Sequence, residues 1–298
     1  MEIVVRMLGG LGNQLFQYAY ARYLSTKNED YKIYLDIREY NTYKVRNYDL
    51  DLLKLNDNIF KFDKKQKKIY DLSRKVFHIY QYIYRKINNR PLGRGMDKIA
   101  KLGYLYSGID AFDEINIKKK EIYMYGYFQD VRIVNPIRDI LLEELSYTGK
   151  LSSNAEEYFK LIKKYENTLA ISIRCGQDYI KSGWPVCSIE YYKNALNIFK
   201  KRNENYKVFI FADDIQIVKE QFGFGDDVVY IENCSAIESL ELLKRCDDFI
   251  ISNSSFSWWG AYLSDNNNKL IIAPKKWFIG LDTIDTPLFL EREMMIVE

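Results

Sequence analysis

Histidine is the scarcest functional side chain in this sequence, because the 298 residues contain only His78. A Ser-His-Asp triad needs a histidine base, and zinc sites are commonly built from several histidines or cysteines. The four cysteines show no metal-type spacing. The sequence therefore argues against a triad hydrolase and against a histidine-ligated metal enzyme.

Long apolar runs and an excess of one charge are also missing. No run approaches the ~20 apolar residues that span a bilayer, and Met1 leads into Glu2-Ile3-Val4-Val5 without the basic and long apolar regions of a signal peptide. We therefore expect a cytoplasmic protein with reduced cysteines. The net charge of +3 gives no reason to expect a nucleic-acid partner.

Alternating strand and helix patterns fill the second half of the chain. Short apolar runs predict strands at 168–174, 207–213, 228–232, 250–253 and 269–274, with helices between them. We expect Ser188 to cap one helix and Ser235 with Glu238 to form a capping box on another. The pattern predicts a doubly wound parallel sheet in a domain of residues 151–298. Strands at 3–5, 32–36 and 121–128 indicate another α/β domain over residues 1–150.

Three polar clusters follow predicted strands of the second domain, at the edge where parallel sheets bind ligands. In the first, Arg174 can hold phosphate oxygens bidentately, or it can form a structural ion pair with Asp178. In the second, Asp213 and Asp214 can accept from a guanine edge or from ribose hydroxyls. The same two carboxylates also suit a helix N-cap or, less well because they are adjacent, a divalent metal.

The third cluster is the run Ser252-Asn253-Ser254-Ser255-Phe256-Ser257, which precedes Trp258 and Trp259. It follows an apolar strand and enters a helix, so we expect Ser254 or Ser255 at the N-cap. The free N–H groups and the positive dipole end of such a helix make an anion site without any basic side chain. The alternative is a capped helix whose tryptophans pack in a core.

A glycine-rich turn, Gly9-Gly10-Leu11-Gly12-Asn13-Gln14, follows the first strand and precedes a helix. Backbone N–H groups in such a turn are open to a ligand. The turn lacks the third glycine of the dinucleotide fingerprint. The amides of Asn13 and Gln14 could bind a sugar hydroxyl or a phosphate, and the alternative is a tight turn with no ligand.

Residues 61–94 are basic, yet they carry a helical stripe of apolar side chains at Leu72, Val76, Ile79, Ile83 and Ile87. Two interpretations are open. In the commoner one, the helix packs on the protein and turns its charges to solvent. In the other, the helix lies on an anionic membrane surface, and the protein would be a peripheral membrane protein at the inner face of the membrane.

These motifs together resemble glycosyltransferase family 11, the bacterial-type alpha-1,2-fucosyltransferases. The similarity runs from residues 9–19 to Trp277 and includes residues 186–192, 211–214 and 254–261. The resemblance implies a GT-B-like fold, in which two Rossmann-like domains face each other across a cleft. The C-terminal domain would bind GDP-beta-L-fucose, and the N-terminal domain would present a glycan acceptor, with the 2-hydroxyl of a galactoside as the expected target.

The resemblance also implies an inverting reaction that needs neither a metal nor another cofactor. Arg174 is the implied diphosphate contact, we expect Asn13 near the fucose or the acceptor, and Asp178 is a candidate for the base, which the sequence alone does not identify. The implied GDP-fucose contacts are Gly10, Gly12, Asn13, Gln14, Ser172, Arg174, Asp213, Asp214, Asn253, Ser254, Ser255, Phe256 and Ser257.

One family motif departs from the pattern. The signature His-x-Arg-Arg-x-Asp-Tyr reads Ser172-Ile173-Arg174-Cys175-Gly176-Gln177-Asp178-Tyr179 here. Ser172 replaces the histidine that helps to hold guanine, so guanine selectivity is in question, whereas Arg174 matches the diphosphate-binding arginine. Three alternatives stay open: a transferase for another nucleotide sugar or linkage, a catalytically weak GDP-sugar-binding protein, and a nicotinamide-dependent enzyme, which the missing glycine disfavours.

Overall fold

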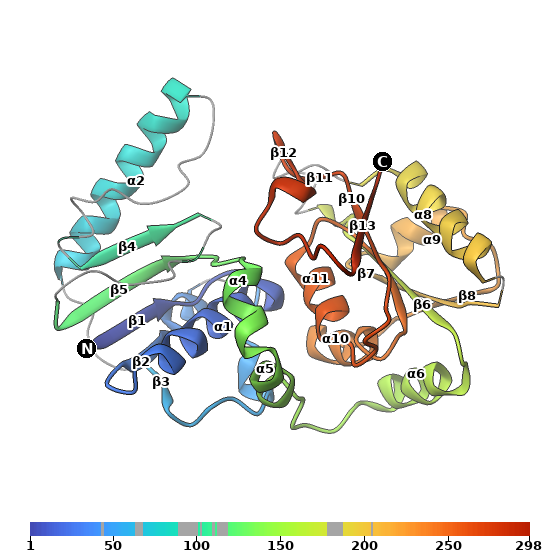
Figure 1. Cartoon of the computed structure of the whole chain (residues 1–298), viewed down its shortest axis with the longest axis horizontal. Coiled ribbons are helices and arrows are strands. Elements are labelled where there is room, and N and C mark those ends of the chain that lie inside the picture. The colour runs from blue at the N-terminus through green and yellow to red at the C-terminus, as the bar shows by residue number, and fades with distance from the viewer. Residues whose placement is uncertain are drawn as a thin grey trace. The chain divides into compact units, whose positions relative to one another are not determined.

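The computed structural model of the chain describes residues 1–42, 45–62, 68–88, 101, 103–108, 111, 119–177, 187–203 and 205–298. The chain divides into two compact units, Met1–Ser146 (unit 1) and Tyr147–Glu298 (unit 2), drawn in Figure 1. Each is a Rossmann-like α/β unit built on one parallel sheet, which confirms the predicted fold class.

Unit 1 holds a five-stranded sheet of order β3-β2-β1-β5-β4, in which all neighbouring strands are parallel. Its strands are β1 Glu2–Arg6, β2 Lys32–Asp36, β3 Ile59–Lys61, β4 Tyr104–Ser107 and β5 Glu121–Gly126. Its helices are α1 Leu11–Lys27, α2 Lys68–Asn88, α4 Val131–Val134 and α5 Arg138–Glu144, with 3-10 turns η1 Arg38–Asn41, η2 Leu50–Leu52 and η3 Asn135–Ile137. The sequence analysis had not predicted β3 or β4.

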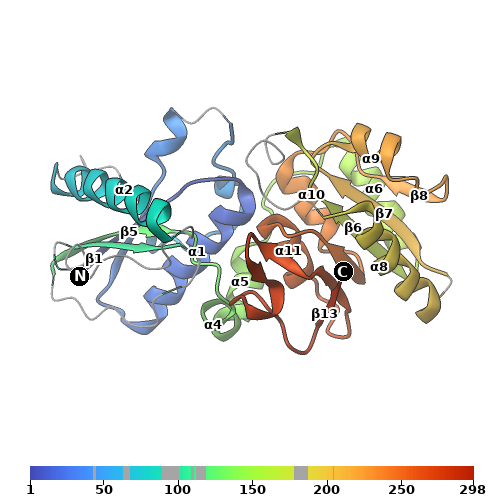
Figure 2. The ribbon, with the colours of Figure 1, turned by 90° about the horizontal axis from the view of Figure 1, so that it is seen from above.

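Helices α1 and α2 cover opposite faces of this sheet. Val4 of β1 packs in a cluster with Phe77 of α2 and with Tyr104 and Tyr123 of the neighbouring strands. Because side chains alternate along a strand, the neighbours of Val4 in β1 point to the other face, where α1 contacts β1 and β2. Figure 2 shows α2 running beside the strands of unit 1.

The helix predicted within residues 61–94 is present as α2, but its apolar stripe does not pack on the protein. The five stripe residues are between 48% and 76% exposed: Leu72, Val76, Ile79, Ile83 and Ile87. Phe77, which is fully buried, attaches the helix to the sheet instead. The expectation that the stripe packs while only the charges face solvent is therefore wrong.

Unit 2 holds a six-stranded parallel sheet of order β13-β10-β9-β6-β7-β8. Its strands are β6 Thr168–Ile173, β7 Lys207–Ala212, β8 Val228–Tyr230, β9 Asp248–Ile251, β10 Ile271–Pro274 and β13 Met294–Val297, and a separate hairpin joins β11 Lys276–Phe278 to β12 Leu281–Asp282. Its helices are α6 Ser153–Lys164, α8 Ile189–Arg202, α9 Ile215–Gln221, α10 Ala236–Leu243 and α11 Ser255–Tyr262, with the 3-10 turn η4 Thr283–Asp285. Five of the six sheet strands were predicted, and β13 was not.

The strand order of unit 2 reverses between β6 and β9. The chain builds β6, β7 and β8 outward in one direction, and then returns to lay β9, β10 and β13 on the other side of β6. This is the order of doubly wound nucleotide-binding sheets, whose ligands bind outside the carboxyl ends of the strands at the reversal. The carboxyl ends of β6 and β9 are therefore the first place to look for a ligand.

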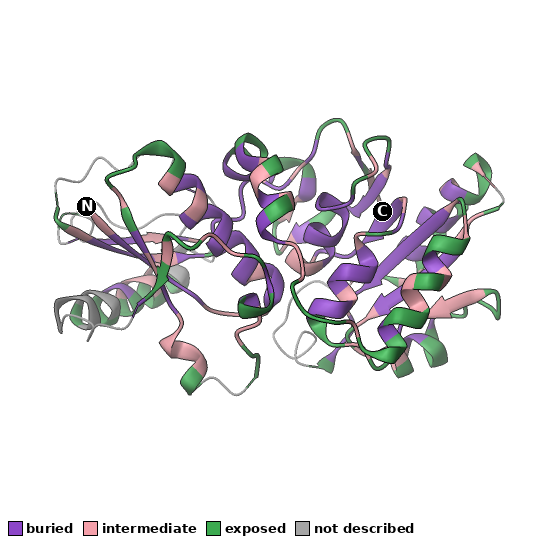
Figure 3. Ribbon diagram, turned by 90° about the horizontal axis from the view of Figure 1, so that it is seen from below, coloured by how far each residue is buried: buried purple, intermediate pink, exposed green. Residues whose placement is uncertain are grey.

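Helices cover both faces of the unit 2 sheet. Leu169, Ile171 and Ile173 of β6 pack in one core cluster with α8 and α9. Since strand side chains alternate, Ser172 points to the opposite face, where α10 and α11 lie (Figure 1). Figure 3 shows the central strands of the unit 2 sheet as buried, the edge strand β8 as intermediate and the outer helix surfaces as exposed.

Two predicted helix starts of unit 2 are confirmed. The Ser188 hydroxyl accepts from the Tyr191 N–H, and Ser235 with Glu238 forms the capping box of α10. The Glu238 carboxylate also accepts at 2.7 Å from the backbone N–H of Ser152, which caps α6. Burial alone would raise the pKa of Glu238, but these hydrogen bonds outweigh it and lower the pKa to about 2. One carboxylate thus fixes the starts of two helices.

Candidate functional site

Three serine hydroxyls meet at the reversal of the unit 2 sheet. The Ser257 hydroxyl oxygen lies 2.7 Å from that of Ser172 and 2.9 Å from that of Ser252. All three side chains are buried. This serine cluster joins the end of β6, the end of β9 and the first turn of α11. We therefore see Ser172 and Ser257, which were both predicted to contact a ligand, as residues that place α11.

The first turn of α11 lies at the carboxyl edge of the sheet. Ser254 occupies the N-cap position, as expected, but its side chain makes no capping hydrogen bond. The first N–H groups of any helix have no carbonyl acceptor within it, and the positive dipole end lies there. Ser254, Ser255 and Phe256 are half-buried, whereas Trp258 and Trp259 lie in the core. The simple interpretation of the tryptophans is thus confirmed, and it is compatible with an anion at the helix start.

Arg174 directly follows β6, and its guanidinium pairs with the carboxylate of Asp213, which directly follows β7. Asp213 also accepts from the backbone N–H groups of Cys175 at 2.8 Å and Gly176 at 2.9 Å. An ion pair of Arg174 is therefore present, with Asp213 as a partner, and the expected pair with Asp178 stays a prediction. Asp178 itself lies outside the described residues.

The two adjacent carboxylates after β7 have protein donors. Asp214 is the N-cap of α9 and accepts from the Ile217 N–H at 3.2 Å, which confirms the N-cap interpretation. Asp213 holds the Arg174–Gly176 segment through three donors. Both carboxylates thus shape the edge of the sheet, and their predicted contacts with guanine or ribose stay predictions.

Asn253 and the cysteines of the edge also act within the protein. The Asn253 side chain is buried, donates to the Trp277 carbonyl at 3.1 Å and accepts from the Cys187 thiol at 3.5 Å. Burial, followed by the nearby carboxylates Asp213 and Asp214, raises the pKa of the Cys175 thiol to about 12. Burial likewise raises the pKa of Cys187 to about 11. Both thiols are therefore protonated near neutral pH and are not nucleophiles.

The glycine-rich turn of unit 1 is shaped by close packing. Gly9 has a φ of +83°, and a Cβ atom there would lie 2.6 Å from the Asn13 amide nitrogen, so the position requires glycine. The Gln14 amide is fully buried and bonds to the carbonyls of Gly9 and Asn47 and to the Asp49 N–H. The predicted ligand contact of Gln14 is therefore wrong. Gly12 is likewise buried inside α1, while Gly10 is its half-buried N-cap.

Asn13 lies at the reversal of the unit 1 sheet, between β1 and β5. Its side-chain oxygen accepts from the Gln129 amide at 2.9 Å, and the residue is half-buried. Gln17 fixes the same place, since it accepts from the Leu8 N–H and donates to the Gly126 carbonyl. Phe128, which lies between Gly126 and Gln129 in the sequence, has a strained backbone φ of 52°. The sequence analysis missed Gln129, which lies just beyond its predicted strand 121–128.

A charged network at the carboxyl ends of β1 and β2 was also missed. The buried Arg6 pairs with Glu39 and lies over the Tyr125 ring, 4.7 Å from its centroid. Asp36 accepts from Arg38 and from the Tyr123 hydroxyl. Burial acts to raise the pKa of Asp36, but these donors outweigh it and lower the pKa, so the carboxylate stays ionised. The only sequence signal was that Asp36 ends a predicted strand.

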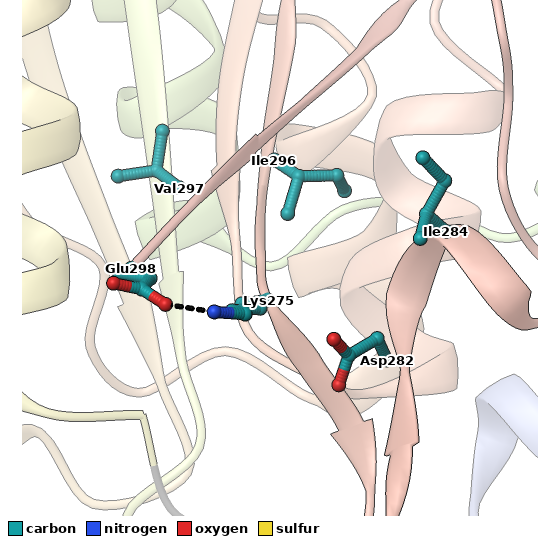
Figure 4. A pocket seen from close by; sticks show the side chains of 6 residues that line it. All are labelled: Lys275, Asp282, Ile284, Ile296, Val297 and Glu298. Carbon is teal, nitrogen blue, oxygen red and sulfur yellow. Dashed lines mark hydrogen bonds and ion pairs between the residues drawn. The ribbon is translucent and has the colours of Figure 1, made fainter.

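A hollow also opens beyond the carboxyl ends of β10 and β13, away from the reversal. Figure 4 shows its lining, in which Lys275 pairs with Glu298: Lys275, Asp282, Ile284, Ile296, Val297 and Glu298. Within the described ranges, no group of three His, Cys, Asp or Glu residues could hold a metal ion. Among all the residues that the structure describes, no helix is long and apolar enough to cross a membrane.

A doubly wound sheet with a helix start at its reversal is the arrangement of nucleotide-binding α/β proteins. Residues 2–279 match the family model of Glycosyl transferase family 11, and the chain therefore belongs to that family. This confirms the predicted resemblance and makes the protein a glycosyltransferase.

Two relatives from Escherichia coli are similar over nearly their whole length. An alpha-1,2-colitosyltransferase is 30% identical over 287 residues, covering 93% of this chain and 92% of the relative. The O-antigen biosynthesis glycosyltransferase WbnK is 27% identical over 292 residues, covering 91% and 93%. Among solved structures, the fucosyltransferase NodZ from Bradyrhizobium has a TM-score of 0.48 at 12% identity, covering 87% of this chain and 92% of NodZ.

Proposed function

We propose that this glycosyltransferase transfers L-fucose from GDP-beta-L-fucose to a glycan hydroxyl, with inversion and without a metal or other cofactor. The proposed target is the 2-hydroxyl of a galactoside. The observation that carries the proposal is the position of the first turn of α11, which the serine cluster fixes at the reversal of the unit 2 sheet. That turn offers N–H donors and a positive dipole end to a diphosphate.

Arg174 is the proposed second diphosphate contact. As the bond between fucose C1 and oxygen breaks, GDP gains negative charge, and fixed donors near that charge lower the barrier. A guanidinium has five N–H donors, so Arg174 can keep its pair with Asp213 and still donate to a phosphate. On this proposal Asp213 holds Arg174 ready for the phosphate.

Unit 1 is the proposed acceptor side. Asn13 is the residue of the glycine-rich turn that combines partial exposure with a place at the strand reversal. We assign its amide to a hydroxyl of the fucose or of the acceptor, with Gln129 holding the amide in orientation. The ionised Asp36 is committed to Arg38 and Tyr123, so we do not assign it as the base that deprotonates the acceptor.

A colitosyl donor is the second candidate, because a relative with 30% identity is named an alpha-1,2-colitosyltransferase. Colitose is L-fucose without the 3-hydroxyl. The two donors therefore differ by one polar group, and a site that hydrogen-bonds this hydroxyl discriminates strongly against the sugar that lacks it. The choice between them is a question of which sugar binds and is transferred.

A binding panel followed by a transfer assay tests the proposal. Thermal unfolding is measured with GDP, GDP-fucose, a GDP-activated colitose, GDP-mannose and UDP-sugars. A ligand at 100 times its Kd adds ~2.7 kcal/mol to the stability of the folded protein, which such a measurement detects. We expect GDP and GDP-fucose to stabilise the protein. We also expect transfer of fucose to a galactoside, with an alpha-1,2 linkage identified by NMR. Stabilisation by UDP-sugars alone, or binding of GDP-fucose with no transfer to any galactoside, contradicts the proposal.

A further inference from the structure

Helix α2 exposes a row of apolar side chains, here called the α2 stripe: Leu72, Val76, Ile79, Ile83 and Ile87. Each is at least 48% exposed, and the neighbouring Tyr82 is 61% exposed. Single exposed apolar residues are ordinary on a protein surface, but a continuous row along one helix marks an interaction surface. We therefore expect the α2 stripe to contact a partner.

The opposite face of α2 is fixed to the unit 1 sheet. The Phe77 ring is fully buried, and its centroid lies 4.2 Å from that of Tyr106. The Gln81 amide donates to the Tyr106 hydroxyl at 3.0 Å. The helix cannot turn its stripe inward without breaking these contacts, so the stripe is presented outward as a fixed feature of unit 1.

The charge around the α2 stripe indicates the partner. Helix α2 contains 5 Lys or Arg and 1 Asp, a net charge of +4, whereas the whole chain has +3 and the remainder therefore has −1. Residues on a helix are ~100° apart, which places the exposed Lys75 and Lys86 next to the stripe on its far side from Phe77. An apolar row beside cations is complementary to a surface that has an apolar interior and anionic groups on its outside.

We infer that the α2 stripe is a docking surface for an anionic lipid bilayer. The aliphatic side chains enter the boundary between headgroups and acyl chains, while Lys75 and Lys86 extend to the lipid phosphates. Tyr82, with the Lys86 ammonium 4.9 Å from its ring centroid, takes the headgroup level that tyrosine prefers. A second copy of the chain is a poorer occupant, because pairing two α2 helices brings a net charge of +4 against +4.

Vesicle co-sedimentation of the full chain tests this inference without any sugar donor, so its result is independent of the proposed function. The vesicles are phosphatidylcholine alone, or phosphatidylcholine with a third of phosphatidylglycerol. We expect binding to the anionic vesicles that falls at least tenfold in 0.5 M salt, and weak binding to the neutral ones. The paired substitution Ile79→Glu with Ile83→Glu, and separately Lys75→Glu with Lys86→Glu, should each weaken binding at least tenfold.

Ile279→Glu is the matched control, because Ile279 is a 70% exposed isoleucine in unit 2 and should leave vesicle binding unchanged. Thermal unfolding of each variant shows that it folds. Binding that the stripe variants leave intact, or no binding to anionic vesicles at all, overturns the inference. Self-association of the wild type in solution that Ile79→Glu with Ile83→Glu abolishes also overturns it, since the stripe would then join two copies of the chain.

Discussion

The hydroxyl of Ser257 lies 2.7 Å from the hydroxyl of Ser172, and this contact fixes the first turn of α11 against the end of β6. The same Ser257 oxygen lies 2.9 Å from that of Ser252, at the end of β9. The position of the helix start thus depends on a buried polar cluster. We therefore expect substitutions in that cluster to weaken binding of the nucleotide-sugar donor, although none of the three serines contacts this donor in the proposed site.

Ser257→Ala should lower stability and weaken GDP binding together. The substitution leaves two buried hydroxyls with one partner fewer, which costs about 1–2 kcal/mol. Ser264→Ala is the matched control, because Ser264 is equally buried and donates to the Cys246 carbonyl beyond the other end of α11. Calorimetric titration with GDP should show at least a fivefold weaker Kd for Ser257→Ala only. Equal Kd values for both variants would show that the cluster does not place the binding turn.

Glu238 should make unit 2 sensitive to acid. Its pKa is about 2 in the folded chain against an ordinary value of 4.5. The resulting stabilisation, on the order of 3 kcal/mol, is complete above pH 4.5 and is lost as the pH falls towards 2. Glu238→Gln should remove it and flatten the dependence in that window, while Glu157→Gln, at an exposed site on α6, should change little.

Tryptophan fluorescence suits this measurement, because all four tryptophans lie in unit 2. Denaturant unfolding is followed at pH 6, 4 and 3 for the three proteins. An unchanged pH dependence in Glu238→Gln would mean that the two helix starts do not rely on an ionised carboxylate.

The sequence was sufficient to find three sheet strands of unit 1 and five of unit 2. It missed β3, whose three residues Ile59–Lys61 are all at least partly exposed, and β4 and β13, which are four residues each and carry no alternation of their own. Such strands are defined by their neighbours in the sheet, and strand neighbours are not visible in a local pattern.

The position of the candidate site was predictable from the sequence, but the contacts between its residues were not. The sequence placed Arg174, Asp213 and the 252–257 run at one edge of a parallel sheet. It could not show that Asp213 takes Arg174 and two N–H groups, because that depends on β7 lying beside β6. The burial of Gln14 was hidden for the same reason, since its partners Asn47 and Asp49 belong to a distant loop.

Asn13→Ala should reduce turnover at least tenfold while leaving the Kd for GDP unchanged. The Asn13 amide lies in unit 1, whereas the proposed diphosphate contacts lie in unit 2. Gln129→Ala, which removes the donor to the Asn13 oxygen, should lower turnover less, because it loosens the amide but does not delete it. Steady-state kinetics with GDP-fucose and a galactoside give both values. If Gln129→Ala is the more severe change, Gln129 is the substrate contact and Asn13 orients it.

Chelation should leave the enzyme active. The proposed mechanism assigns the stabilisation of the leaving diphosphate to Arg174 and to the N–H groups of α11, and it gives no step to a metal. Turnover measured in 5 mM EDTA, and again with added Mg²⁺ or Mn²⁺, should agree within about twofold. Loss of turnover in EDTA that Mn²⁺ restores would show that a divalent cation shares the diphosphate.

Turnover of Arg174→Ala with GDP-fucose is the most direct test of the proposed donor site. Deleting one preorganised donor commonly costs ~10²–10³ in rate, and we expect a loss of that size with the fold intact. Arg245→Ala is the control, because Arg245 pairs with Asp265 and lies before β9, at the opposite edge of the sheet. Near-normal turnover of a folded Arg174→Ala protein would contradict the assignment of Arg174 to the diphosphate.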